Sequence, residues 1–243
     1  MYCKRNGKTG FEHRGRRFIM LNQSTLWVYL LRLFLFVAGI GLAFWIFPML
    51  INKPFNEYHL PQIGLEWGSD KKEMIEHLNN LSNKNETGLT TNALIARLKT
   101  NLIADTRFFI PFYILLFFIL ALHIKEMDLA NPNLFFYAIM ICIFAAAIAD
   151  WIENDLIWKS FSAESNEANL RGKVLACAFK WGLIGAAVAL ISLGYLSAKN
   201  YWVAIPGFVN AAILVFGTLI NPYLIQWGFG MLGILLLLTS IFP

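Results

Sequence analysis

The sequence predicts an all-α fold, a polytopic bundle of about six transmembrane helices, and three observations support this prediction. Of the 243 residues, 58% are hydrophobic and 14% are charged, whereas about a quarter of the residues of a soluble domain are charged. The mean hydropathy is +0.56. The apolar residues also form long runs, each close to the roughly 20 residues that a helix needs to cross the hydrocarbon layer.

Residues 1–25 form a basic tail that we expect in the cytoplasm. Residues 1–19 hold six of the 20 basic residues and one of the 15 acidic residues, so the net charge of +5 comes from this tail. An excess of Lys and Arg before the first span is typical of a cytoplasmic N-terminus. We expect no nucleic-acid binding, because only this tail would supply the charge. Met20 directly precedes the first apolar run and is an alternative start.

The apolar runs define the expected order of elements. The first run, residues 26–51, is too long for the apolar part of a signal peptide, and no cleavage site follows it, so we expect a retained signal anchor. An extracytoplasmic helical segment follows at 52–106, and a five-span membrane bundle occupies 107–243. Within this bundle, the expected spans cover residues 108–124, 134–152, 174–197, 201–220 and 223–242.

The segment 52–106 is expected to form a small pair of helices on the outer face of the bundle. The pattern after Asp70 places apolar residues on one side of a first helix, and Ser69 or Asp70 suits its N-terminus. A second helix is expected to begin at Thr90 or Thr91 and to run directly into the second span.

Orientation follows from the basic tail and the number of spans. Six crossings return the C-terminus to the cytoplasm, with the short loops around Lys125 and Lys199 inside. Residues 52–106 and 153–173 then lie outside. The outer segment 52–106 also carries basic residues, but long loops follow the charge rule less strictly than short ones.

Small residues and prolines predict how the spans pack. A run of alanines precedes Asp150 in the third span, and the fourth span contains Gly182 and Gly185, so we expect these two spans to touch closely. The fifth span contains Pro206 followed by glycine, which we expect to open a kink, with Asn210 one turn further on. Many transporters build their sites from broken helices, so Pro206 and Asn210 are a candidate transport feature.

Acidic residues interrupt the third span. Asp150, Glu153 and Asn154 lie at positions i, i+3 and i+4 and so share one helix face. A carboxylate in a membrane helix is costly and usually has a partner or a function. The second and third spans are joined by a short loop and should be antiparallel neighbours. We therefore expect Asp105, at the outer start of the second span, near the acids of the third.

Lys180 is the expected partner of these acids. It lies about six residues, or roughly 9 Å, below the outer start of the fourth span, which is the level of Asp150. We predict an Asp150–Lys180 pair, with Glu153, Asp105 and Arg107 nearby. Two interpretations of this polar cluster stay open. It is a satisfied structural group that fixes helix register, or it is a site for a cation, a proton or a lipid headgroup.

The sequence predicts no metal site and no cofactor, and it favours a protein that is not an enzyme. The four histidines do not occur at ligand spacing. A phosphate-binding loop, a nucleophile elbow and an HExxH motif are absent. We expect a structural or accessory membrane component that contacts the lipid bilayer. The alternatives are a small transporter or ion-binding protein, and a lipid-modifying enzyme that uses the acids. The sequence does not identify the protein partners.

Two short motifs carry a resemblance. Residues 104–113 read Ala-Asp-x-x-Phe-Phe-Ile-Pro-x-Tyr, and residues 149–154 read Ala-Asp-x-x-Glu-Asn. This pair resembles a signature of small uncharacterised multi-pass membrane proteins of bacteria. The resemblance covers the second and third spans and part of the fourth. It implies a location in the bacterial inner membrane, and it implies no activity.

Overall fold

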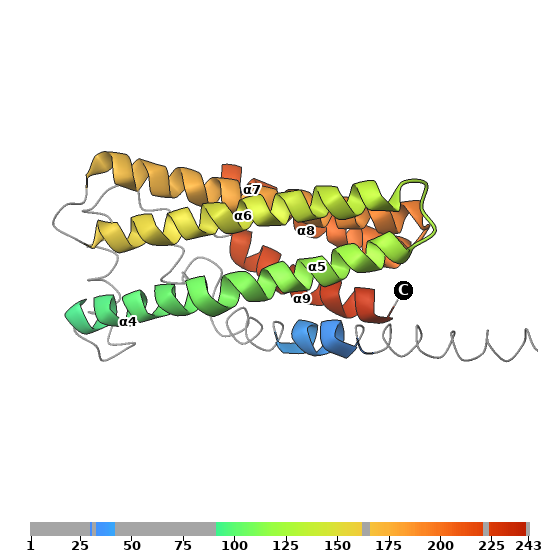
Figure 1. Cartoon of the computed structure of the whole chain (residues 1–243), viewed down its shortest axis with the longest axis horizontal. Coiled ribbons are helices and arrows are strands. Elements are labelled where there is room, and N and C mark those ends of the chain that lie inside the picture. Colours follow the sequence, from blue (N-terminus) through green and yellow to red (C-terminus); the bar gives the residue numbers. More distant parts are fainter. Residues whose placement is uncertain (1–29, 31–32, 42–90, 162–165, 221–223, 242–243) are drawn as a thin grey trace, which may run out of the picture.

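A computed structural model of the chain describes residues 30, 33–41, 91–161, 166–220 and 224–241. These residues form helices joined by short connections (Figure 1). In chain order, the helices are a segment at 33–41, α4 (Thr91–Ala104), the π-helical turn η1 (Asp105–Phe109), α5 (Ile110–Glu126), α6 (Pro132–Ser160), α7 (Glu167–Ser197), α8 (Tyr201–Leu219) and α9 (Leu224–Ile241).

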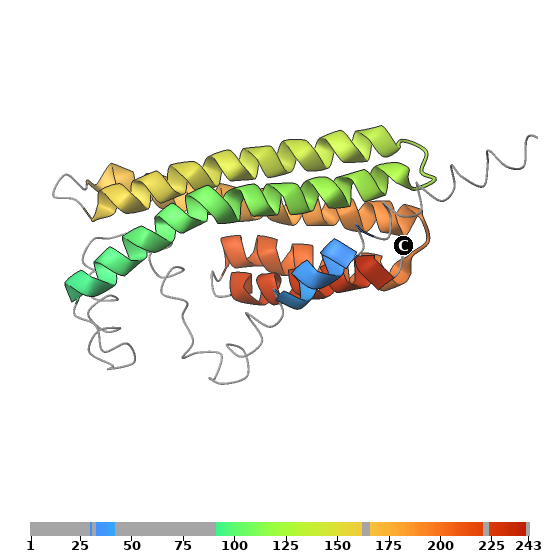
Figure 2. The ribbon, with the colours of Figure 1, turned by 60° about the horizontal axis from the view of Figure 1, so that its bottom comes forward.

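The helices form an elongated bundle, and from α5 to α9 consecutive helices run in opposite directions (Figure 1). Helices α5, α6 and α7 lie along one side, and α8, α9 and residues 33–41 lie on the other (Figure 2). Residues 33–41 pack against α9, since a Cβ atom added at Gly39 would lie 3.0 Å from the carbonyl oxygen of Gly233. Large apolar side chains from α5 to α9 fill the space between the two sides, among them Phe117, Ile143, Val188, Leu214 and Leu235.

Local sequence explains where the long helices begin and end. Pro132 occupies the first turn of α6. A backbone N–H at this position has no acceptor within the helix, so the missing N–H of proline costs no hydrogen bond. The side chain of Asn166 accepts a hydrogen bond of 2.8 Å from the backbone N–H of Asn169 and caps α7. At the connection between α7 and α8, Lys199 has a φ of 60°, and this left-handed residue ends the helix.

Four of the described helical stretches are long and apolar enough to cross a membrane: Lys99–Glu126, Pro132–Ser160, Glu167–Ser197 and Tyr201–Leu219. They fit an integral membrane protein. A fifth apolar stretch, Trp227–Ile241, is shorter. Most of the first expected span at 26–51, and the expected outer helix after Asp70, lie outside the described residues. The number of six spans therefore stays a prediction.

Two helices extend beyond the ends of the expected spans. The third was expected to end at Ile152, but α6 continues to Ser160. The fourth was expected to begin at Val174, but α7 begins at Glu167. Polar residues near these ends suggested the edge of the membrane. Several of them, including Lys173, are instead buried inside longer helices.

The start of the second span agrees with the sequence, whereas the roles of the glycines do not. Helix α4 begins at Thr91 and continues through η1 into α5, as expected. Helices α6 and α7 lie side by side (Figures 1 and 2). However, Gly185 faces α8, because a Cβ atom there would lie 3.0 Å from Val215 Cγ2. Gly182 has nothing within 4 Å of such an atom.

Candidate functional site

The centre of the polar cluster is an ion-pair group between α6 and α7. Lys180 Nζ lies 3.2 Å from Asp150 Oδ1 and 2.5 Å from Glu153 Oε2. All three side chains are almost fully buried, with exposed fractions of 4%, 3% and 0% for Lys180, Asp150 and Glu153. The expected Asp150–Lys180 pair is therefore present. Glu153 is a second direct partner of Lys180, where the sequence suggested only that it lies nearby.

Asn154 extends the cluster from α6 to the π-helical turn. Its Nδ2 donates to Asp105 Oδ2 over 2.7 Å and to Thr106 Oγ1 over 3.2 Å. Asp105 and Asn154 are thus brought together across 49 residues of sequence. Arg107, which was expected nearby, is exposed and does not line the pocket described below.

Pro111 explains why the helix widens at this point. A proline has no N–H, and its ring clashes with the carbonyl four residues earlier, here that of Arg107. The chain forms the π-helical turn η1 just before it, and the N–H of Ile110 donates to the carbonyl oxygen of Asp105. Such turns occur frequently at functional sites. This one places Asp105 and Thr106 within hydrogen-bonding distance of Asn154.

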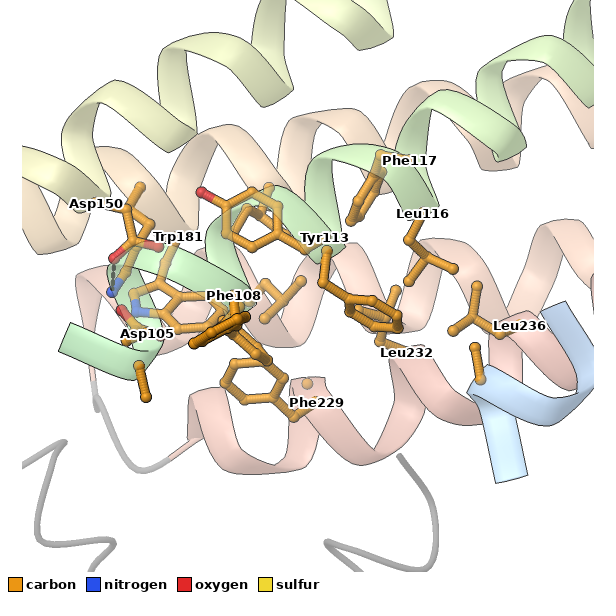
Figure 3. Close-up of a pocket in the computed structure, with 18 of the residues that line it drawn as sticks. Asp105, Phe108, Tyr113, Leu116, Phe117, Asp150, Trp181, Phe229, Leu232 and Leu236 are labelled. Carbon is orange, nitrogen blue, oxygen red and sulfur yellow. Dashed lines mark hydrogen bonds and ion pairs between the residues drawn. The ribbon is translucent and has the colours of Figure 1, made fainter. Parts of the chain in front are cut away.

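A pocket of about 750 Å³ lies beside the cluster. Asp105, Asp150 and Lys180 contribute to its lining at one end. Leu116, Phe117, Leu232 and Leu236 line the other end (Figure 3). The wall is also rich in aromatic side chains, which are Phe108, Phe109, Phe112, Tyr113, Trp181 and Phe229. The pocket is therefore amphipathic along its length.

Trp181 occupies the polar end of this pocket, next to Asp105 and Asp150 (Figure 3). Its ring meets that of Phe229 edge to face, with centroids 4.7 Å apart. Lys180 Nζ lies 5.0 Å from the centroid of the Trp181 ring. The indole is 5% exposed. Its Nε1 has no hydrogen-bond partner among the residues that the structure describes.

The charged end of the pocket lies near the expected surface of the membrane. On α6, the ion pair of Asp155 and Lys159 is exposed. Asp150 lies five residues earlier, about 7.5 Å along the helix axis. Along η1 and α5, Asp105 and Leu116 are separated by about 16 Å. This separation is close to the thickness of one leaflet of a 30 Å hydrocarbon layer, about 15 Å.

The candidate transport residues lie elsewhere. Helix α8 is continuous through Pro206 and is not broken there, and the expected kink stays a prediction. Asn210 is fully buried and faces α9. With its amide oriented to suit its neighbours, the nitrogen donates to the carbonyl oxygen of Gly228 over 2.8 Å, and the oxygen accepts from the N–H of Leu232 over 3.1 Å. Asn210 does not line the pocket.

Sequence reasoning missed much of the pocket wall. Phe229, Leu232 and Leu236 lie on α9, and nothing distinguishes them from other apolar residues of that run. Thr106 was missed because a threonine inside a helix is common. Lys173 was placed outside the fourth span, although a lysine seven residues before Lys180 shares its helix face and was a usable signal.

Among the described residues, no group of three or more His, Cys, Asp or Glu side chains is arranged to hold a metal ion. The arrangement offers hydrogen bonds and charge at one end of a pocket, and apolar surface along the rest. No family model, curated protein or solved structure matches this chain.

Proposed function

We propose that this protein is an accessory integral membrane protein that holds one amphiphilic molecule in the pocket beside the polar cluster. The amphipathic lining of the pocket carries this proposal. A ligand with a polar head and an apolar chain matches the lining at both ends. The pocket volume of about 750 Å³ also lies within the range of roughly 300–1,000 Å³ that small-molecule sites occupy.

The position of the pocket supports a ligand taken from the membrane. Its polar end is near the surface and its apolar end is deeper, which is how a lipid lies in one leaflet. Its length of about 16 Å, from Asp105 to Leu116, is close to the thickness of that leaflet. A lipid-like molecule can therefore enter the pocket without turning over.

A holding role is better supported than transport or lipid chemistry. Helix α8 is unbroken at Pro206, and Asn210 bonds to the backbone of α9. A lipid-modifying enzyme needs an acid or base that is available for proton transfer. Both Asp150 and Glu153 instead contact Lys180. Transport and lipid modification remain the alternatives.

The location that we propose is the bacterial inner membrane, with both termini in the cytoplasm and the cluster near the outer surface. The basic tail supports this orientation. Single cysteines introduced at exposed Asp128 and at exposed Asn166 lie at opposite ends of the bundle. In a chain with its native cysteines replaced, an impermeant reagent outside the cell should label the variant at position 166 alone. Labelling of position 128 alone would reverse the orientation.

Photo-crosslinking tests the pocket itself. The full chain in lipid nanodiscs is exposed to a long-chain amphiphile that carries a photoreactive group near the end of its chain. Labelled peptides from α5 and α9 are expected. Leu116→Trp should fill part of the pocket and lower this labelling several-fold, whereas Leu115→Trp, at an exposed neighbour outside the lining, should not.

The melting temperature of both variants must be compared first, because an added indole in a packed interior can destabilise the fold. The proposal is wrong if the two folded variants are labelled equally. It is also wrong if the label appears only on residues that face the surrounding lipid.

A further inference from the structure

We infer that the polar group received by the pocket is an uncharged hydroxyl, as in a long-chain alcohol or a glyceride. This inference rests on the proposed function, because it specifies the ligand of the same pocket. Two observations support it: the kinds of hydrogen-bonding groups that line the polar end of the pocket, and the charges that are already paired there.

The indole N–H of Trp181 needs a hydrogen-bond acceptor. It is a donor only. The residue is 95% buried, and its Nε1 has no partner within the described part of the chain. A buried polar group without a partner costs free energy. An oxygen atom on a bound ligand would satisfy this donor.

The carboxylates at the same end of the pocket can accept a hydrogen bond from a ligand. Asp105 and Asp150 both line the pocket beside Trp181 (Figure 3). An ionised carboxylate accepts hydrogen bonds on two oxygens and can take several at once. At Asp150, the contact from Lys180 Nζ to Oδ1 therefore does not exhaust this capacity. A hydroxyl both accepts and donates, so one hydroxyl can bond to the indole and to a carboxylate.

A cationic head fits this end less well. Ammonium groups are recognised by carboxylates and by the faces of aromatic rings. Here Lys180 already contacts Asp150 and Glu153, and its Nζ lies 5.0 Å from the centroid of the Trp181 ring. A second cation at this place would be repelled by the first.

An anionic head is also disfavoured. A phosphate or carboxylate would lie beside Asp105 and Asp150, and Lys180 is already shared between Asp150 and Glu153. Like charges at short range in a medium of low dielectric constant repel strongly. An uncharged hydroxyl avoids both kinds of repulsion.

The test uses three photoreactive probes with the same chain and different heads: a primary alcohol, a trimethylammonium and a phosphate monoester. Each is crosslinked to the full chain in nanodiscs of uncharged lipid. The alcohol is expected to label the pocket peptides most strongly. Trp181→Phe keeps an aromatic ring, although a smaller one, and removes the N–H, and it should lower labelling by the alcohol about five-fold, which corresponds to about 1 kcal/mol.

Trp151→Phe is the matched control, because Trp151 is exposed on α6 and does not line the pocket. It should leave labelling by the alcohol unchanged. Stronger labelling by the ammonium or the phosphate probe would overturn the hydroxyl inference and leave the proposed function standing. An equal loss of all three probes in Trp181→Phe would also overturn it, since ring packing would then be the cause. If no probe labels the pocket, the proposed function itself fails.

Discussion

The polar cluster between α6 and α7 and the Asn210 contact between α8 and α9 both place polar atoms inside an apolar bundle, but their surroundings differ. Asn210 gives one hydrogen bond to the backbone of α9 and takes one from it, and it does not line the pocket. Asp150 and Lys180 are paired, yet they also line a pocket beside an indole N–H that has no partner among the described residues. Similar sequence signals thus mark two different structural situations.

The difference shows how to separate a structural polar group from a binding site in a membrane helix. A polar residue on a membrane helix is a functional hypothesis by default. It becomes a structural contact when backbone atoms satisfy it, as for Asn210. It becomes a candidate site when a polar atom without a partner belongs to a residue that lines a pocket, as at Trp181.

The largest expected effect comes from Lys180→Met. This change leaves the carboxylates of Asp150 and Glu153 buried without their ammonium partner, and breaking a buried ion pair in this way costs about 3–5 kcal/mol. We expect a large fall in the melting temperature of the purified protein in detergent. Lys159→Met, at an exposed pair with Asp155, is the control and should cost about 1 kcal/mol or less.

A triple variant makes the first test sharper. Combining Lys180→Met with Asp150→Asn and Glu153→Gln removes the buried charges as well as their partner. It should recover part of the lost melting temperature, because the residues are coupled. Equal melting temperatures for Lys180→Met and Lys159→Met would show that the cluster is not buried as described.

A change in packing gives the next largest effect. A Cβ atom at Gly207 would lie 2.1 Å from Ser192 Oγ, so Gly207→Ala should push α7 and α8 apart at a cost of about 1–3 kcal/mol. Gly182→Ala is the control, because nothing lies within 4 Å of its added atom. Alanine there should be neutral or slightly stabilising. Thermal unfolding of both variants decides whether α8 lies against α7 at this position.

Asn210→Ala tests the difference between the Asn210 contact and the polar cluster. It removes two hydrogen bonds between α8 and α9, but the Gly228 carbonyl and the Leu232 N–H, four residues apart in one helix, can then bond to each other. We expect a loss of about 1 kcal/mol in unfolding free energy and no change in labelling by the alcohol probe. Trp181→Phe should show the opposite pattern. If Asn210→Ala abolishes labelling while the fold is kept, the distinction between the two regions is wrong.

The smallest effect is expected from Pro111→Ala. Alanine restores the N–H and removes the ring that excludes the Arg107 carbonyl. The π-helical turn is then free to return to α-helix, and Asp105 would move relative to Asn154. The change in unfolding free energy should stay below about 1 kcal/mol, because one hydrogen bond is lost and one is gained. Labelling by the alcohol probe should fall, and unchanged labelling would show that the turn does not position the site.

Part of the site could be predicted from the sequence because helix geometry is regular. The spacing of Asp150, Glu153 and Asn154 put them on one face, and a short loop made α5 and α6 neighbours. Residue counts then placed Lys180 at the depth of Asp150. The α9 side of the pocket could not be predicted, because Phe229 and Leu232 look like any other apolar residues of a span. Which of them face a cavity depends on how α9 is rotated against α5 and α7.

The sequence by itself determined that the chain forms apolar helices, since long runs without charge leave the backbone no partner in lipid except itself. It also determined which polar residues share a helix face. Only the tertiary structure decided that Gly185 faces α8, that Asn210 bonds to α9 and that a pocket opens beside Trp181. These outcomes depend on the rotation and separation of packed helices. Many side chains together determine this rotation and separation, and they cannot be predicted from the period of a single helix.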